Sequence, residues 1–346
     1  MANKHGVAIA GAGVRSHVVP FAAGFAFLLS GCEKNRPLQS VLHPGGGDAL
    51  VISDIAWLLF GGGTVIFAGV MVLLAFSLRD GRRSVRPATW LIGAGVIFPV
   101  TVLSALLIYS VVRSQQLLTP MSQDALVVSV TGKMWWWEVR YRDPASGRDI
   151  TLANEIRVPA GRPVYLALTS DDVLHSFWVP ALAGKVDMLP GRMTRLRIQT
   201  DRPGVFRGQC AEYCGEQHAR MALHVVVEEP QAFDAWLGNQ AKPASTPSGV
   251  LAERGRAIFL EQRCSACHTI RGAAEETVAA NSLAPDLTHI GSRMFLGAGI
   301  LRNDPQNMRD WIAQTQSFKH GARMPSFNEL ESEKLHALSA YLEQLK

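Results

Sequence analysis

Hydrophobic and polar positions form contrasting patterns along the chain, and the two most apolar runs of residues lie near its beginning. Residues from about 49 to 78 and from about 88 to 112 are apolar almost throughout, with Asp54 the one charged residue in them. Each run exceeds the ~20 residues that a membrane-spanning helix needs, and neither shows a polar face. The runs therefore predict a two-helix transmembrane hairpin within residues 32–113 rather than two buried core helices.

A different pattern extends from Ala125 to Glu229. Short runs of β-branched and aromatic residues alternate there with Gly, Pro and Asp. Regular spacing of such runs between turn residues is typical of an all-β sandwich or barrel. We assign residues 114–240 to this all-β domain.

The last third of the chain is helical in character. Residues 241–249 contain Pro, Ser and Gly without apolar periodicity, which predicts a linker. Beyond it, the stretches Leu251–Gln262 and Glu331–Lys346 have apolar residues at helical spacing. Residues 250–346 therefore form a small all-α domain.

The N-terminal residues 1–31 have the features of a secretory signal. Positive charge at Lys4 and Arg15 accompanies an apolar stretch from Val18 to Leu29. The sequence Leu29-Ser30-Gly31-Cys32 also resembles a bacterial lipoprotein processing box, in which Cys32 would carry the lipid. A plain signal followed by a free thiol is the alternative.

Charge gives the direction of insertion. The formal net charge is +5, and the densest basic cluster lies between the two apolar runs, at Arg79, Arg82, Arg83 and Arg86. Basic residues form no stripe with interleaved aromatics, so we do not expect a nucleic-acid partner. The positive-inside rule places the arginine loop in the cytoplasm and everything after Arg113 outside. We expect a multi-pass protein of a bacterial inner membrane with periplasmic domains.

Four of the five cysteines lie in two close pairs, and the first pair has the spacing of a metal loop. Cys210, Cys214, His218 and Met221 follow one another at short intervals. Thiolate, imidazole and thioether together favour copper, and two thiolates can bridge two metal ions. A binuclear centre then needs a second imidazole, for which His175 is the candidate. Zinc and a disulfide are the alternatives, but Met is a poor zinc ligand.

The second pair belongs to the sequence Cys264-Ser265-Ala266-Cys267-His268, the pattern of c-type haem attachment. A free cysteine pair or a metal clip is the alternative. Met324-Pro325 resembles the distal methionine segment of class I cytochromes c, and Ala284-Pro285-Asp286-Leu287 resembles the loop that walls their haem. This resemblance makes Met324 the distal iron ligand, while Met294 and Met308 are expected to pack in the core.

The copper loop carries a family resemblance of its own. Residues 210–221 read C-A-E-Y-C-G-E-Q-H-A-R-M and residues 174–180 read L-H-S-F-W-V-P, and both resemble the CuA loops of cytochrome c oxidase subunit II. The similarity extends over about Ala49–Glu229. It implies a cupredoxin-like fold and a magnesium ion, shared with subunit I, at the Glu212 side chain. It leaves His224 with a structural role. The implied copper ligands are His175, Cys210, the backbone carbonyl of Glu212, Cys214, His218 and Met221.

The segment 132–137, G-K-M-W-W-W, resembles the aromatic segment of the same family. There the first tryptophan, Trp135 here, receives electrons from a cytochrome. If the segment is a strand, alternation places Trp135 and Trp137 on one face and Trp136 on the other. Asp187 also matches the family, near the expected contact with subunit I. The start of the second apolar run lacks the carboxylate that many relatives use for proton uptake, so we assign no such role.

These observations predict a multidomain membrane-anchored protein. Its parts are a two-helix transmembrane hairpin, an all-β cupredoxin-like Greek-key barrel and a small all-α cytochrome c domain. By resemblance, it is the electron-input subunit of a haem-copper terminal oxidase. Electrons would come from cytochrome c or another periplasmic donor, pass from haem c to CuA, and reach subunit I, which reduces oxygen and pumps protons. The alternatives are the small subunit of a CuA-containing nitric oxide reductase and a membrane-tethered electron carrier.

Overall fold

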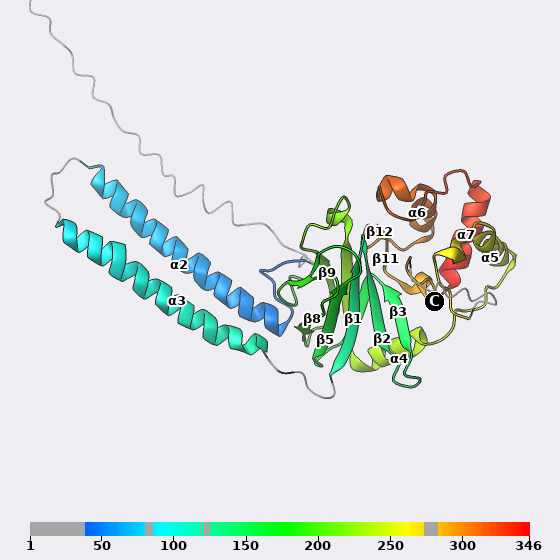
Figure 1. The fold of residues 1–346 in the computed structure, drawn as a ribbon, viewed down its shortest axis with the longest axis horizontal. Coiled ribbons are helices and arrows are strands. Elements are labelled where there is room, and N and C mark those ends of the chain that lie inside the picture. Colours follow the sequence, from blue (N-terminus) through cyan, green and yellow to red (C-terminus); the bar gives the residue numbers. More distant parts are fainter. Residues whose placement is uncertain (1–38, 80–85, 119, 121–124, 273–282) are drawn as a thin grey trace, which may run out of the picture. The chain divides into compact units, whose positions relative to one another are not determined.

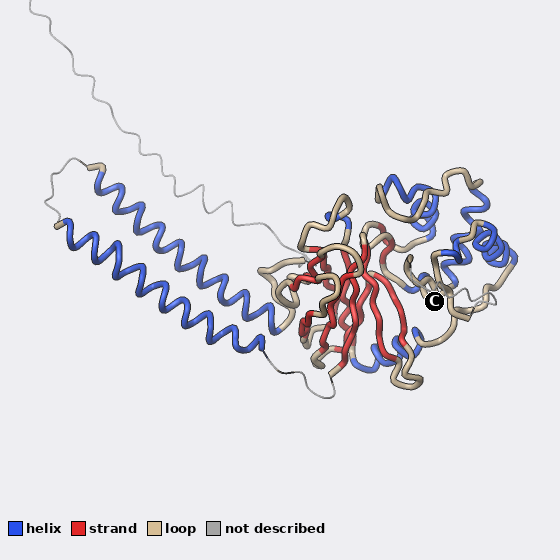
Figure 2. The backbone as a smooth tube through the Cα atoms, in the orientation of Figure 1, coloured by secondary structure: helices blue, strands red, loops and turns tan. Residues whose placement is uncertain are grey.

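The computed structural model describes residues 39–79, 86–118, 120, 125–272 and 283–346 (Figure 1). The predicted signal segment, Cys32 and two arginines of the loop, Arg82 and Arg83, lie outside these residues. The fold class expected from the sequence is confirmed: two long apolar helices, a β-sandwich and a helical domain follow one another along the chain (Figure 2).

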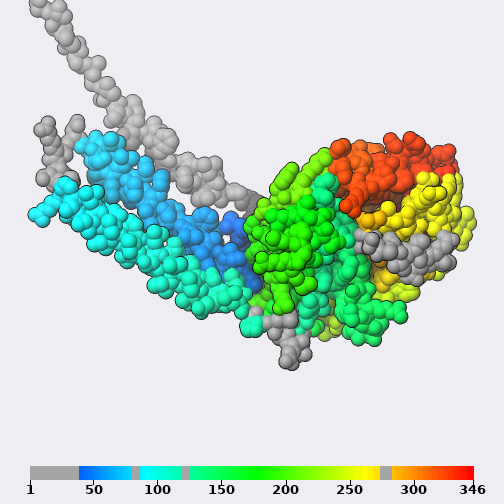
Figure 3. All heavy atoms as spheres, in the orientation of Figure 1, coloured from blue at the N-terminus to red at the C-terminus, as the bar shows by residue number. Residues whose placement is uncertain are grey.

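The two apolar helices are α2 (Gly47–Ser77) and α3 (Phe98–Ser114), the latter continuing a π-helical segment, η2 (Thr89–Ile97). Large apolar side chains are exposed along both helices, which are blue and cyan in Figure 3. Both helical spans are long and apolar enough to cross a membrane. Asp54 of α2 forms an ion pair with Arg113 of α3, so the charge in the first run has a partner on the neighbouring helix.

The β-domain contains two five-stranded sheets. The first has the order β3-β2-β1-β5-β8 and the second the order β4-β10-β9-β6-β7. Pairing is parallel between β1 and β5 and between β4 and β10, and antiparallel between the other neighbours. The strands are β1 (Leu126–Lys133), β2 (Trp136–Arg142), β3 (Asp149–Ala153), β4 (Glu155–Pro159), β5 (Val164–Ser170), β6 (His175–Trp178), β7 (Val186–Met188), β8 (Thr194–Ile198), β9 (Gly204–Cys210) and β10 (Ala222–Glu228).

Burial along the strands shows which faces are covered. In β1, Val128 and Val130 are fully buried, whereas Val127, the residue before Val128, is exposed. This alternation is expected for a strand with one covered face. Strand β10 differs, because six consecutive residues from Ala222 to Val227 are buried. Its second face is therefore covered too, and the cover comes from the helical domain described below.

A helix that the sequence pattern did not single out, α4 (Pro230–Gln240), closes one end of the sandwich. Its Phe233 and Trp236 pack against the ring of Tyr141, at centroid distances of 6.4 and 5.4 Å. The helix lies within residues assigned to the β-domain from the sequence, and it buries apolar surface that the open end of the sandwich would otherwise expose.

The helical domain is built from α5 (Val250–Glu261), α6 (Pro305–Phe318) and α7 (Ser332–Gln344). It also contains a short ribbon of β11 (Phe295–Leu296) and β12 (Leu301–Arg302). Helices α5 and α7 cross closely, and Gly255 permits this contact. A Cβ atom at Gly255 would lie 2.0 Å from the carbonyl oxygen of Ala337.

The segment 241–249, predicted as a linker, contains no strand and connects α4 to α5. Hydrogen bonds hold it along the helical domain. The amide of Ala244 donates to the carbonyl of Arg271 at 2.8 Å, and the amide of Ser248 donates to Oε1 of Gln344 at 2.8 Å. The hydroxyl of Ser245 donates to the Gln344 carbonyl. The segment thus follows the surface of the domain that it introduces.

Candidate functional site

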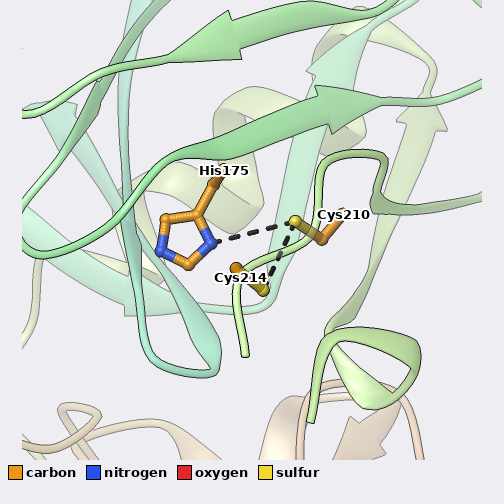
Figure 4. A group of neighbouring side chains, drawn as sticks. All are labelled: His175, Cys210 and Cys214. Carbon is orange, nitrogen blue, oxygen red and sulfur yellow. Dashed lines mark hydrogen bonds between the residues drawn. The ribbon is translucent and has the colours of Figure 1, made fainter. Parts of the chain in front are cut away.

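The predicted copper residues come together between strands β6 and β9 and the loop after β9. His175 begins β6 and Cys210 ends β9, and the two strands are paired with Phe177 opposite Cys210. Figure 4 shows His175, Cys210 and Cys214 pointing toward one another. Their ligand atoms lie within 4.8 Å of one another, and all three side chains are buried. This is a pocket for a soft metal rather than a surface cluster.

The rest of the loop completes the set. Cys210 Sγ lies 3.7 Å from Cys214 Sγ and 3.2 Å from the carbonyl oxygen of Glu212. Cys214 Sγ lies 3.6 Å from His218 Nδ1 and 3.8 Å from Met221 Sδ. Both cysteines are free thiols, so the disulfide alternative is not the state of this structure. Two sulfurs between two imidazoles suit a binuclear thiolate-bridged centre, so the residues present fit the group.

The backbone fixes the loop at both ends. The amide of Cys210 donates to the carbonyl of Met221 at 2.9 Å, which closes the loop across β9 and β10.

The position of His175 depends on a glycine in the aromatic segment. A Cβ atom at Gly132 would lie 2.8 Å from His175 Cδ2, so a side chain there would displace the imidazole.

The loop favours negative charge on one of its two sulfurs, that of Cys210. The hydrogen bond between the two sulfurs lowers the pKa of Cys210 to about 3 and raises the pKa of Cys214. Burial works against protonation of His175, but its hydrogen bonds to Asp172 and Cys210 raise its pKa. Thiolate formation is a condition for metal binding, because a metal ion replaces the thiol proton.

Asp172 is a site residue that the sequence analysis did not identify. Its carboxylate lies 2.9 Å from His175 Nε2 and accepts a hydrogen bond from the amide of Met134 at 2.7 Å. A carboxylate on the outer ring nitrogen fixes which nitrogen is available to a metal. Its position three residues before His175 was the available signal.

Glu212 belongs to the copper loop, and Asp187 lies on β7, opposite Ser176 of β6. The carboxylate of Glu212 is partly exposed, with Lys185 Nζ 3.8 Å away, and Asp187 is exposed. The structure therefore leaves both carboxylates accessible. Their expected roles at a shared magnesium ion and a subunit contact stay predictions.

Two of the four predicted haem residues line an open cavity of about 980 Å³, which includes space open to solvent. His268 and Met324 both line it, together with the loop residues Ala284, Pro285 and Leu287. Cys264 is partly buried and Cys267 is exposed, and both are free thiols. A mainly apolar cavity with an imidazole and a thioether fits a haem, and the two cysteines stand beside that imidazole in sequence.

The imidazole of His268 is oriented by the loop that the cytochrome resemblance indicated. Its Nδ1 lies 2.7 Å from the carbonyl oxygen of Pro285, which fixes this nitrogen as the donor and leaves Nε2 as the free ligand atom. Burial lowers the pKa of His268, which keeps the imidazole neutral. Both properties suit an axial ligand to iron.

One prediction about the methionines is confirmed and the other is wrong. Met308 is 2% exposed and packs in the core of the helical domain, as expected. Met294 is 37% exposed and does not pack there. It lies at the contact with the β-domain, where its amide donates to the carboxylate of Glu155 at 2.9 Å. The expectation assumed a core formed by this domain alone.

The tryptophans do not follow the simple alternation expected from the sequence. Trp135 lies in the turn between β1 and β2 rather than in a strand, so the strand rule does not apply to it. Trp137 is fully buried and packs on Phe177, whereas Trp135 and Trp136 both line the haem cavity. The indole nitrogen of Trp135 donates to the carbonyl of Cys214 at 2.9 Å. Trp135 thus touches both sites.

Comparison with known proteins finds two family models that match different parts of the chain. Residues 143–229 match the family model "Cytochrome C oxidase subunit II, periplasmic domain", and residues 252–346 match the model "Cytochrome c". The first implies copper and the second implies haem, and the residues described above fit both groups.

Curated relatives cover more of the chain. Cytochrome c oxidase subunit 2 of Bacillus subtilis (strain 168) is 30% identical over 350 residues, which cover 92% of this chain and 94% of that protein. The subunit 2 of Alkalihalophilus pseudofirmus is 36% identical over 223 residues, which cover 64% of this chain and 62% of that protein, just under two thirds of its length.

Among solved structures, the periplasmic domain of subunit II of cytochrome oxidase of Bradyrhizobium japonicum is 31% identical, with a TM-score of 0.32. The alignment covers 35% of this chain and 95% of that domain. The Bacillus subtilis relative covers most of the chain, and the two family models match two separate parts of it. The chain therefore belongs to the cytochrome c oxidase subunit II family, as a membrane-anchored member with a cytochrome c domain.

Proposed function

We propose that this chain is the electron-input subunit of a haem-copper terminal oxidase. It passes electrons from haem c to CuA and on to subunit I, where oxygen is reduced to water with proton pumping. A single observation carries the proposal. Trp135 lines the haem cavity and its indole also donates to the carbonyl of Cys214, a proposed copper ligand. One side chain therefore links the two cofactor sites.

For the copper centre, we propose that two thiolates, two imidazoles, a thioether and a backbone carbonyl would hold a pair of copper ions. When bound, such a centre supplies one-electron transfer with little change in geometry. The chain provides the rigid frame, since its strands and the Cys210–Met221 backbone bond fix the ligand positions. The proposed ligands are His175, Cys210, the Glu212 carbonyl, Cys214, His218 and Met221.

For the haem, we propose that Cys264 and Cys267 would attach it through thioethers and that His268 and Met324 would supply its iron ligands. Methionine–histidine ligation gives a high reduction potential, which suits a carrier that feeds a terminal oxidase. The hydrogen bond from His268 to the Pro285 carbonyl supports this assignment, because it directs the other ring nitrogen to the cavity.

The finer features of the assembly are also proposals. We infer that the carboxylate of Glu212 contributes to a magnesium site shared with subunit I, since it stands partly exposed at the edge of the copper loop. We infer a multi-pass hairpin with the arginine loop in the cytoplasm and both later domains in the periplasm. Signal processing after residue 31, lipidation at Cys32 and a donor such as cytochrome c belong to the same hypothesis, as do the domain limits 114–240 and 250–346.

The test compares two neighbouring tryptophans in the assembled oxidase. After flash reduction of haem c, oxidation of the haem and reduction of CuA are followed at separate bands. Trp135→Phe should slow this transfer by about tenfold or more, because it removes the indole bridge to Cys214. Trp136→Phe is the matched control: Trp136 lines the same cavity but makes no described contact with the copper loop.

The proposal fails if haem c in the unmodified oxidase stays reduced while CuA and subunit I turn over at full speed. The cytochrome domain would then lie off the main route of electrons. Equal rates in the two tryptophan variants would leave the route intact but remove Trp135 from it.

A further inference from the structure

The helical domain contacts the β-domain through a polar and aromatic surface next to both cofactor sites. His224 of β10 stacks on Phe295 of β11, with ring centroids 3.9 Å apart and an interplanar angle of 7°. The amide of Ala222 donates to the carbonyl of Ala298 at 3.1 Å. These contacts explain why β10 is buried on both faces, and they make the haem cavity a joint product of the two domains.

At the centre of this surface lies Lys319, which follows directly on α6. The residue is 4% exposed, so its ammonium group is removed from water. Nζ donates to three carbonyl oxygens, those of Trp135 at 2.6 Å, Arg220 at 2.9 Å and Gly297 at 3.2 Å. Among the ion pairs of the described residues, none neutralises this group.

Burying an ammonium group without a carboxylate is costly, and burial lowers the pKa of Lys319 to about 7. The position nevertheless requires a hydrogen-bond donor. Three carbonyl groups converge there from three separate segments, and each would lose a partner next to an apolar side chain. A purely apolar contact would avoid the cost of the charge but would leave these oxygens unsatisfied.

The three segments are those that electron transfer depends on. Trp135 links the cavity to Cys214, Arg220 stands between the proposed copper ligands His218 and Met221, and Gly297 lies in the wall of the haem cavity. One ammonium group thus ties the cavity wall, the aromatic bridge and the copper loop to one another.

We propose that Lys319 is a positioning residue that holds the haem cavity against Trp135 and the copper loop, and thereby sets the rate of transfer between the two cofactor sites. This inference rests on the proposed function, because it assigns a role within the haem-to-copper step. That step would transfer one electron from a haem held by the helical domain to copper held by the β-domain, with no bond made or broken.

Residues next to Lys319 extend the contact between the helical domain and the β-domain toward solvent. His320 Nδ1 lies 2.6 Å from a carboxylate oxygen of Glu216, and Gln217 donates through Nε2 to the His320 carbonyl at 2.8 Å. His320 and Glu216 are exposed, so water screens their pairing. The buried contacts of Lys319, rather than the exposed pair of His320 and Glu216, are expected to fix the distance between the haem cavity and the copper loop.

The experiment uses the full oxidase with Lys319→Met, which keeps the length of the side chain and removes its donors. Lys319→Gln keeps part of the donor capacity. Lys334→Met is the matched control, since Lys334 lies in the same domain and pairs with Glu261 near the surface. Two quantities are measured: the flash-induced rate from haem c to CuA, and hydrogen exchange of the amides in residues 134–137 and 216–222.

We expect the transfer rate to decrease in the order wild type, Lys319→Gln, Lys319→Met, with a loss of about tenfold to a hundredfold in the last. Exchange in both segments should increase in the same order, while the haem and CuA spectra and the Lys334→Met rate stay unchanged. A role in packing alone would favour Met over Gln, because Met is the more apolar side chain.

Unchanged rate and exchange in a spectrally intact Lys319→Met oxidase would overturn the proposal. If that variant fails to fold, the Lys319→Gln variant is the test. Its transfer rate from haem c to CuA must then be lower than that of the wild type, with unchanged haem and CuA spectra. Failure of the proposed function has a different signature. Haem c would then not reduce CuA in the wild type at all, whereas the exchange measurement would still show whether Lys319 holds the joint.

Discussion

The copper site and the haem site of this chain are built in opposite ways. Five of the six proposed copper ligands lie within residues 210–221, and strand pairing brings in the sixth, His175. The haem cavity instead draws its lining from residues as far apart as His268 and Leu342, and also from Trp135 and Asn154 of the β-domain. The first site is a local structure held in a rigid frame. The second exists only when two domains are packed together.

The difference leads to distinct sensitivities. Changes in the packing of the helical domain should affect the haem without altering the copper, and changes in the β-frame should affect the copper first. Acidification should weaken the contact between the helical domain and the β-domain. Three variants test these expectations, beginning with the largest effect.

Gly255→Ala should destabilise the cytochrome domain by about 3 kcal/mol or more, because the new Cβ would meet the Ala337 carbonyl where α5 crosses α7. The measurement is chemical denaturation followed at the haem band, with the CuA band recorded in the same titration. Gly238→Ala is the control, since a Cβ in α4 at that position meets nothing within 4 Å. Loss of both bands together would show that the domains unfold as one unit.

Lowering the pH should weaken the fold at His224. Burial and the positive charge of Arg207 lower the pKa of His224 from 6.5 to about 4. The unfolded chain therefore binds more protons than the folded chain between these values, so stability is full above pH 6.5 and falls as the pH approaches 4. The expected loss is about 3 kcal/mol. His224→Phe should flatten this dependence, measured as unfolding free energy against pH.

His336→Phe, at an exposed position in α7, should leave the pH dependence as it is. An unchanged slope in His224→Phe would show that other groups cause the acid sensitivity. Because His224 stacks on Phe295, hydrogen exchange at the joint should also rise in acid before the copper spectrum changes.

Gly132→Ala should lower copper affinity by about tenfold to a hundredfold, because the added Cβ displaces the imidazole of His175. Competition with a copper chelator gives the affinity, and the haem spectrum serves as an internal control. Retained affinity would mean that the loop residues alone hold the metals. That result would make the copper site still more local than the structure indicates.

Much of this molecule was predictable from the sequence because the deciding interactions are short-range along the chain. The spacing of Cys210, Cys214, His218 and Met221 already predicts a soft-metal loop, and the Cys264–His268 motif predicts a haem-attachment segment. Two apolar runs of spanning length predict the hairpin, since a membrane helix satisfies its own backbone. The β-domain followed from alternation between turn residues.

The remaining features depend on packing between distant segments. Trp135 was predicted in a strand but lies in a turn, Met294 was predicted in the core but lies at the domain joint, and Lys319 gave no signal in the sequence. Met294 and Lys319 depend on contacts across more than a hundred residues, such as the bond from Lys319 to the Trp135 carbonyl. Local spacing determined which cofactors the chain can bind. Only the tertiary structure decided how the two sites meet, because the burial and hydrogen bonding of these residues exist only once the two domains are in contact.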